Sequence, residues 1–225
     1  MVNQAFLKGI IAMRFESNEK LTAYVSENPE LKMLELIDCP GLTSLPELPS
    51  TLHFLLIRHC PGLTSMPSLP STLINLRIDK CPGLTSLPAL PSSLAALTLD
   101  SCPALTSLPA LLNSLKYLRV DNCPGLTNLP ALPNSLTELF VENCPGVRNL
   151  PALPSTLTCL WACSCPNLSS LPTLPSTLTS LLVENCPGLT SLPAIPSTLT
   201  SLAIHSCPGL DSRGLRVGKL FISLM

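Results

Sequence analysis

The chain has 225 residues, of which 46% are hydrophobic and 12% charged, and its formal net charge is -1 at pH 7. Positive mean hydropathy excludes a disordered chain, and 13 basic against 14 acidic residues exclude the broad positive field typical of nucleic-acid binding. No apolar run approaches the length of about 18 residues that a membrane-spanning helix needs. We therefore expect no nucleic-acid partner and no membrane segment, and the 25 prolines indicate a repeat instead.

Residues 1–30 do not share the pattern of the residues that follow them. Apolar side chains are interspersed there with charged ones at a spacing that predicts one or two short helices. The apolar residues are Phe6, Leu7, Ile10, Ile11 and Met13. The end of a stacked repeat must be covered, so we expect these residues to form a helical N-terminal cap. The apolar stretch is too short and poorly flanked to be a secretory signal peptide.

Residues 31–210 contain nine units that start 21 residues apart, with no insertion or deletion, and the ninth is followed as far as Leu210. The idealised unit reads LxxLxIxxCPGLTSLPxLPST, and 24 of the 25 prolines fall at three places in it. The period is marked by a cysteine before a proline at Cys39, Cys60, Cys81, Cys102, Cys123, Cys144, Cys165, Cys186 and Cys207.

Each part of the unit predicts a local structure. Leucine and isoleucine at the fourth and sixth places alternate with variable residues, as in a short strand with one buried face. Cys-Pro-Gly predicts a type II turn whose glycine has a positive φ, with Ala104 and Asn167 as the two departures. Frequent proline in the second half excludes an α-helix and favours an extended, polyproline-like backbone. The sequence thus predicts a leucine-rich-repeat solenoid with a parallel β-sheet on the concave face and little helix outside the N-terminal cap.

The regular spacing of nine of the eleven cysteines argues against a disulfide framework, a metal cluster or a nucleophile. We expect these nine to point inward as a ladder that bonds backbone groups at the turn. Neighbouring thiols about 4.8 Å apart would mispair on oxidation, which predicts a reducing, cytoplasmic environment. Cys159 and Cys163 depart from the pattern and are expected to line Trp161 on the outward face. The histidines His53, His59 and His205 show no ligand spacing and are predicted to lie on the surface.

Residues 211–225 are predicted to form a C-terminal partial repeat or cap. Leu220 follows Leu199 by 21 residues, so a tenth unit begins there before the chain stops at Met225. Two alternatives stay open. The segment is either a frayed apolar edge that recruits another copy of the chain, or the first part of a longer protein.

Information about a partner must lie at the variable third, fifth and seventh places, because the shared places form the core. An apolar patch occupies successive strands at Tyr117, Phe140, Trp161 and Leu182. Exposed aromatic side chains rimmed by charge are typical of interaction surfaces. We therefore predict a partner-binding site made of Tyr117, Arg119, Glu138, Phe140, Glu142, Trp161 and Leu182. The alternative is that the rings pack on one another and stiffen the sheet.

The seventh place carries a column of acids on adjacent strands, Asp79, Asp100, Asp121 and Glu142. Like charges opposite one another are unfavourable in a sheet, and we expect Arg77 and Arg119 to offset part of this repulsion. The repulsion that remains between the carboxylates favours binding of a cation from outside the chain, either a basic segment of a partner or a metal ion such as calcium. The alternative is a solvated acidic stripe that keeps the sheet soluble.

No set of residues has a catalytic arrangement, so we expect neither an enzyme nor a cofactor. The sequence lacks paired carboxylates in a pocket, a nucleophile with a base, and a phosphate-binding loop. One further hypothesis is an ice- or surface-binding array built from the column Thr137, Thr158, Thr179 and Thr200.

The order LPxLPST, LxxLxI and LTSLP over residues 31–210 resembles the bacterial class of leucine-rich repeat found in type III secretion effectors of the YopM and IpaH kind. The resemblance implies a protein-binding domain, a role in virulence and delivery into the cytosol of a host cell. Some members join the repeats to a cysteine-dependent ubiquitin ligase domain, so the alternative is the substrate-recognition portion of a larger ligase. This chain differs from the family in two ways. It has cysteine in place of the ladder asparagine, and its unit of 21 residues is one residue longer than is typical of the family.

Overall fold

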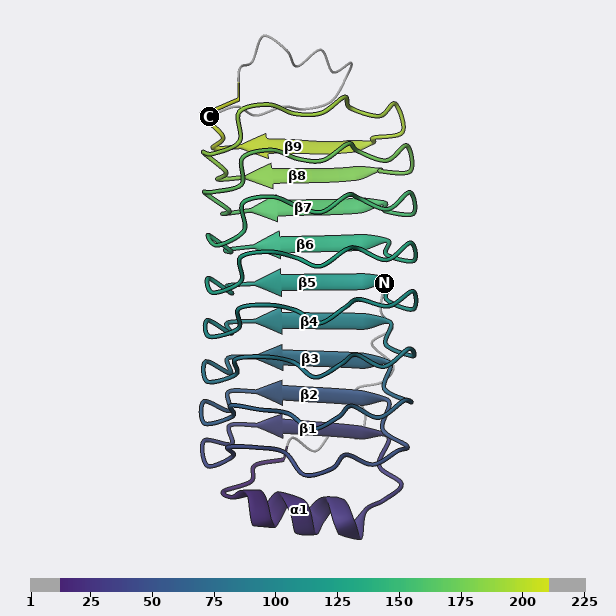
Figure 1. The fold of residues 1–225 in the computed structure, drawn as a ribbon, viewed down its shortest axis with the longest axis vertical. Helices are drawn as coiled ribbons and strands as arrows, with labels where there is room; N and C mark the ends of the chain where they lie inside the picture. The colour runs from purple at the N-terminus through teal and green to yellow at the C-terminus, as the bar shows by residue number, and fades with distance from the viewer. Residues whose placement is uncertain (1–12, 211–225) are drawn as a thin grey trace.

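The computed structural model describes residues 13–210, which form one stack of coils (Figure 1). Each coil contributes a five-residue strand to a parallel sheet of nine strands in chain order. The strands are β1 (Met33–Ile37), β2 (Phe54–Arg58), β3 (Asn75–Asp79), β4 (Ala96–Asp100), β5 (Tyr117–Asp121), β6 (Glu138–Glu142), β7 (Cys159–Cys163), β8 (Ser180–Glu184) and β9 (Ser201–His205). The predicted leucine-rich-repeat solenoid with a parallel sheet is confirmed.

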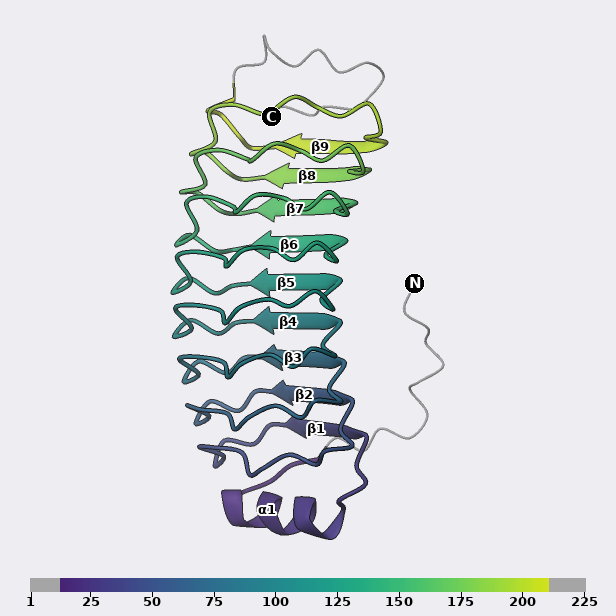
Figure 2. The same ribbon diagram turned by 45° about the vertical axis from the view of Figure 1, so that its right-hand side comes forward.

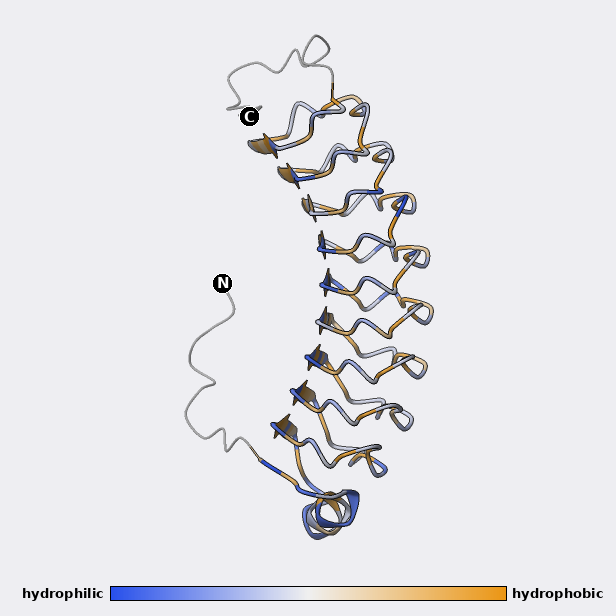
Figure 3. Ribbon diagram, turned by 90° about the vertical axis from the view of Figure 1, so that its left-hand side faces the viewer, coloured by the Kyte–Doolittle hydropathy of each residue, from blue (hydrophilic) through white to orange (hydrophobic). Residues whose placement is uncertain are grey.

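The register of the sheet follows directly from the constant length of the unit. Leu34 lies opposite Leu55 and Leu36 opposite Ile57, and all later pairs repeat this offset of one unit. The strands line the concave side of the stack (Figure 3), while the returning segments run behind them without regular helix (Figure 2). Every variable place of one strand therefore lies beside the same place of the next.

The core is a continuous column of the shared residues. In the second unit, Leu52, Leu55, Ile57, Cys60 and Leu63 are all 0% exposed, and equivalent residues of the other units belong to the same cluster. Burying one such leucine contributes about 1.5–3 kcal/mol. Each coil buries these side chains against its neighbours, so the core depends on stacking.

The nine repeated cysteines form the predicted inward ladder, and all are buried with free thiols. The Cys144 thiol donates to the carbonyl of Glu142 at 3.0 Å and to that of Val120, in the preceding coil, at 3.8 Å. Burial raises the pKa of the Cys144 thiol to about 12. At Cys60, Cys144, Cys165, Cys186 and Cys207 the ladder therefore links the end of a strand to the preceding coil. The raised pKa keeps the Cys144 sulfur protonated near neutral pH.

The turn after cysteine differs from the prediction. The amide of Leu63 donates to the carbonyl of Cys60 at 3.1 Å, as a β-turn requires, but none of the described repeat glycines has a positive φ. The expected type II turn is therefore wrong. The left-handed residue is the one before cysteine, with φ of 49–54° at Asp38, His59, Lys80, Ser101, Asn122, Asn143, Ser164, Asn185 and Ser206.

Close approach of the coils favours glycine at this turn, although Ala104 and Asn167 take the same place in two units. A Cβ placed on Gly62 would lie 2.9 Å from the carbonyl oxygens of Pro40 and Leu42 in the preceding coil. Asn167 occupies the equivalent place and instead donates from Nδ2 to the carbonyl of Pro145 at 2.7 Å. Contact between coils, and not a left-handed backbone, explains the residue at this place.

A second ladder, of hydroxyl groups, explains the serine or threonine at the end of the unit. Thr72 Oγ1 lies 2.6 Å from the carbonyl oxygen of Ser50 and 2.8 Å from that of Leu52, both in the preceding coil. Threonine or serine makes equivalent bonds in most other units. At Ser114 the hydroxyl is buried without a hydrogen-bond partner among residues 13–210. The role of this hydroxyl was not predicted from the repeat pattern.

The N-terminal helix α1 (Asn18–Glu27) begins at Ser17, whose hydroxyl accepts from the Lys20 amide at 3.4 Å. Its buried side chains, Leu21 and Val25, belong to the same core cluster as the repeats. Met13 was expected in a helix but forms a parallel bridge with Leu36, donating to the Glu35 carbonyl at 3.1 Å. The rest of the expected helical stretch lies in residues 1–12, and the expected C-terminal cap lies in residues 211–225, outside the described residues.

Candidate functional site

The variable places come together on the concave face because side chains alternate along each strand. The fourth and sixth places point into the core, so the third, fifth and seventh point outward. The parallel register then sets each of these outward places beside the same place on the next strand, as in the pair Phe140 and Trp161. Variable places that recur every 21 residues in the sequence therefore lie side by side and form one contiguous surface.

Three aromatic rings meet at the centre of this surface, on β5, β6 and β7. The ring centroids of Tyr117 and Phe140 are 5.2 Å apart with planes tilted by 37°, and those of Phe140 and Trp161 are 4.9 Å apart at 81°. Both distances fall in the range of favourable aromatic pairs. Leu182 on β8 lies opposite Trp161 and is half-buried. We call these four residues the aromatic cluster.

Phe140 corrects the expectation of a fully exposed patch. Its side chain lies between the other two rings and the residue is only 7% exposed, whereas Tyr117 and Trp161 are half-buried. The rings therefore pack on one another, which was the alternative to an exposed patch. It leaves Tyr117, Trp161 and Leu182 as the residues that present apolar surface, with Phe140 supporting them.

Charged groups adjoin the cluster through Arg119 on β5. Its guanidinium donates to Asp121 Oδ2 at 2.9 Å and lies 3.4 Å from both carboxylate oxygens of Glu142 on β6. Burial raises the pKa of Glu142, the nearby Asp121 and Asp100 raise it further, and Arg119 opposes the shift. The last predicted member, Glu138, is half-buried and lies opposite Tyr117.

The acidic column forms as predicted and Arg119 compensates part of it, but the cation at Asp79 differs from the prediction. Asp79 is only 6% exposed and accepts from Arg58 Nε on the neighbouring strand at 2.9 Å. Arg77, the expected partner, is exposed and makes no ion pair among residues 13–210. Arg58 takes this role because the register places it directly opposite Asp79.

The remaining carboxylates of the column have polar partners of different kinds. Asp100 Oδ1 accepts from the Ser101 hydroxyl at 2.8 Å, and Asp121 Oδ1 accepts from Asn143 Nδ2 at 2.8 Å. Among residues 13–210, no group of three or more His, Cys, Asp or Glu side chains is arranged to hold a metal ion. The column therefore offers separate carboxylates and not a convergent metal site.

Cys159 and Cys163 lie on either side of Trp161 along β7, and both are half-buried free thiols. Burial, together with Glu142 and Glu184 nearby, raises the pKa of Cys163 to about 12. Burial also raises the pKa of Cys159. Both thiols stay protonated near neutral pH, so they act as small apolar neighbours of the indole and are weak nucleophiles.

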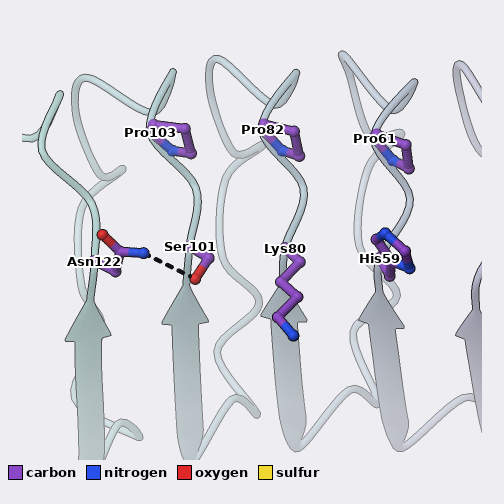
Figure 4. Close-up of a pocket in the computed structure, with 7 residues that line it drawn as sticks. All are labelled: His59, Pro61, Lys80, Pro82, Ser101, Pro103 and Asn122. Atoms are coloured by element: carbon purple, nitrogen blue, oxygen red, sulfur yellow. Dashed lines mark hydrogen bonds between the residues drawn. The ribbon is translucent and has the colours of Figure 1, made fainter.

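A shallow groove of about 380 Å³ crosses the carboxyl ends of β2 to β5 and was not identified from the sequence (Figure 4). Its lining combines three proline rings with the left-handed residues, namely His59, Pro61, Lys80, Pro82, Ser101, Pro103 and Asn122. The sequence signal was the fixed spacing of these two places in the unit. His59 is exposed, as predicted, and its Nδ1 lies 2.6 Å from Asp38 Oδ1, which holds the pKa of that carboxyl below its usual value.

The threonine column has a structural role. The hydroxyls of Thr158 and Thr179 donate to the carbonyls of Thr137 and Thr158 at 3.0 and 3.1 Å, and Thr137 and Thr200 bond in the same way. Their hydrogens are used within the sheet, and the sheet is curved (Figure 3). Both features weigh against the ice- or surface-binding hypothesis.

The fold and the concave surface define a leucine-rich-repeat protein-interaction scaffold. No family model matches the chain, and no curated protein matches it. Two solved structures of YopM are similar to this chain. The one from Yersinia enterocolitica WA-314 has 26% identity and a TM-score of 0.50, and the match covers 84% of this chain and 55% of that one. The one from Yersinia pestis has 26% identity and a TM-score of 0.55, and the match covers 87% of this chain and 66% of that one.

A leucine-rich-repeat domain of a Shigella effector has the same fold, at 22% identity and a TM-score of 0.54, covering 93% of this chain and 90% of that one. YopM from Yersinia pestis is described as a leucine-rich effector protein, which supports the resemblance seen in the sequence. The chain spans between half and two thirds of the length of the two YopM structures. Within residues 13–210, no helix is long and apolar enough to cross a bilayer.

Proposed function

We propose that this protein is a non-enzymatic scaffold that binds a partner protein on its concave sheet. The contact residues are those of the aromatic cluster and its charged neighbours, Tyr117, Arg119, Glu138, Phe140, Glu142, Trp161 and Leu182. The observation that carries the proposal is a packed aromatic cluster left half-exposed at the centre of a concave face. Pre-packed rings lose little entropy on binding, which suits them as anchors.

The structural similarity to YopM and to a Shigella effector domain supports an effector role. We infer that the protein acts in a reducing cytosol, after type III secretion into a host cell, where the buried thiol ladder would stay reduced. The second candidate is the substrate-recognition portion of a larger ubiquitin ligase effector. Sequencing the gene beyond the codon of Met225 tests it, because a ligase domain would follow the repeats.

We also propose a division of the chain into an N-terminal cap, residues 1–30, nine repeats, residues 31–210, and a C-terminal partial repeat or cap, residues 211–225. The contribution of Leu21 and Val25 to the repeat core supports the first part. If residues 211–225 leave the edge of β9 open, this edge would pair with a second copy, and sedimentation at increasing protein concentration would detect the dimer.

The aromatic site is tested by replacing Trp161 and Leu182 with alanine in one variant. A partner is first identified by cross-linking in host-cell lysate, and its affinity for purified wild-type and variant protein is then measured. We expect the double variant to lose at least about tenfold in affinity, as hot-spot residues do. Leu112→Ala is the matched control, because Leu112 is 38% exposed but lies outside the sheet. Unchanged affinity in a folded double variant would refute the site.

A further inference from the structure

Negative charge is concentrated on the concave face. The third, fifth and seventh places of β1 to β9 carry seven acidic residues, Glu35, Asp79, Asp100, Asp121, Glu138, Glu142 and Glu184, against three basic residues, Arg58, Arg77 and Arg119. The face therefore has a formal charge of -4, whereas the entire chain of 225 residues has -1. This imbalance gives the concave face charge complementarity to a basic partner.

Asp100 is the least compensated carboxylate of the column. Its neighbours in register are Asp79 and Asp121, which pair with Arg58 and Arg119, respectively. Asp100 itself makes no ion pair among residues 13–210 and accepts only from the neutral hydroxyl of Ser101. An arriving cation would therefore meet one unpaired carboxylate flanked by two others.

A carboxylate oxygen next to Asp100 also lacks a hydrogen-bond donor. Asp79 Oδ1 is buried without a hydrogen-bond partner among residues 13–210, and Asp79 as a whole is more than nine-tenths buried. A buried acceptor without a donor loses the hydrogen bonds that water gave it in the unfolded chain. This deficit favours a ligand with several N–H groups, and a guanidinium offers five in a fixed fork.

A metal ion fits the column less well than a basic side chain. Calcium takes 6–8 oxygens that converge on one point. Here the carboxylates stand on four successive strands, about 4.8 Å apart, and no convergent group of three occurs in the described part of the chain. Arginine, asparagine and serine already hold one oxygen each of Asp79, Asp121 and Asp100.

We propose that the concave sheet binds a partner segment that carries arginine or lysine, with the cation at Asp100 between Asp79 and Asp121. This inference rests on the proposed function and adds the chemistry of the partner. Trp161 lies three strands from Asp100 and two residues back along the strand, a separation of about 16 Å. An extended chain covers about 3.3 Å per residue, so the basic residue and the apolar residue that contacts Trp161 lie roughly five residues apart.

The test uses a dye-labelled synthetic peptide in which two arginines and two leucines are separated by four glycine or serine residues. Binding is measured by anisotropy, and Trp161, the sole tryptophan, reports contact at the aromatic cluster by its fluorescence. We expect Asp100→Asn to weaken binding at least about fivefold and the matched control Glu47→Gln less than about 1.5-fold. Glu47 is exposed and lies outside the sheet, so its variant removes the same charge elsewhere.

Three results would overturn the inference. The first is equal weakening by Asp100→Asn and Glu47→Gln, because net charge alone would then explain binding. The second is equal binding of a peptide with glutamates in place of the arginines. The third is calcium binding that Asp100→Asn abolishes while peptide binding stays unchanged, which would assign the column to a metal ion.

The same variants separate this inference from the proposed function. If Trp161→Ala with Leu182→Ala abolishes partner binding and Asp100→Asn leaves both partner and peptide binding unchanged, the scaffold function stands and the basic-segment inference is refuted. If peptide binding requires Asp100 but the double variant keeps its affinity for the partner, the aromatic site is refuted and the cation site is supported.

Discussion

The role of a side chain in this molecule depends on its strand neighbours more than on its type. Arg77 and Arg119 occupy the same place in their units, each two residues before an aspartate. Arg119 pairs with Asp121, whereas Asp79 pairs with Arg58 on the adjacent strand. Arg58 lies in register with Asp79 and supplies the ion pair there, which leaves Arg77 exposed.

At the same scale, the Glu142 carboxyl predicts a pH effect on stability. Burial raises its pKa above the ordinary 4.5, so the folded protein holds this proton to higher pH than the unfolded chain does. Stability then falls as pH rises through the interval above 4.5, since the unfolded state binds fewer protons there. We expect wild-type protein to lose stability relative to Glu142→Gln as the pH rises above the ordinary pKa of 4.5.

Urea unfolding of both proteins across this range measures the difference. Glu47→Gln controls for the loss of one surface charge and should not reproduce the trend, because Glu47 is exposed outside the sheet. A constant difference between wild type and Glu142→Gln at every pH would contradict the prediction. The effect should be small, because Glu142 is only half-buried and solvent screens its interactions.

At the scale of the element, most neighbouring units are held together by three kinds of contact between coils. These are the backbone ladder of the sheet, the thiol ladder at its carboxyl end and the hydroxyl ladder before the next strand. The fourth unit departs from this scheme, with Leu112 where seven other units have proline and with Ser114 unbonded. It is the unit in which local sequence fits the common backbone least well.

Leu112→Pro should therefore stabilise the protein. The Leu115 amide donates to the Leu112 carbonyl at 3.0 Å, and the Leu136 amide donates to the carbonyl of Pro133 at 3.1 Å, so the backbone suits proline. The Leu112 amide makes no hydrogen bond within residues 13–210. Proline lowers the entropy of the unfolded chain, and we expect a gain of about 0.4–1 kcal/mol in urea unfolding. Leu112→Ala is the control, and an equal gain there would contradict the explanation.

At the scale of the whole molecule, the constant unit length keeps every ladder in register over nine strands. A repeat of this kind gains stability from each interface between neighbours, and no coil buries its leucines alone. Curvature follows from stacking coils whose strands lie on one side (Figure 3), and it gathers the variable residues on a concave face.

Removal of one whole unit should leave a folded, shorter solenoid. Deleting residues 94–114 joins Ser93 to Leu115 and preserves the register, so we expect a cooperative but less stable protein. Deleting residues 94–113 leaves one extra residue before the next strand and turns its core side chains outward. Circular dichroism and urea unfolding distinguish the two, and equal cooperativity of both deletions would contradict a register-dependent core.

Much of the architecture followed from the sequence because the same pattern is written nine times. Spacing alone predicted the strands, the inward cysteines and the outward columns, since a fixed period forces equivalent residues into equivalent places. The turn was predicted wrongly because Pro-Gly is typical of a type II turn, in which glycine has a positive φ. The actual requirement for glycine is its distance from carbonyl groups of another coil, which no local pattern encodes.

The sequence by itself determined which residues share a face and in what order they lie along the stack. Only the tertiary structure decided how those residues pair. It buried Phe140 between two rings, gave Asp79 to Arg58, and left Asp100 without a cation among the described residues. The reason is physical: a period specifies position along a strand, whereas pairing depends on distances between side chains of different coils.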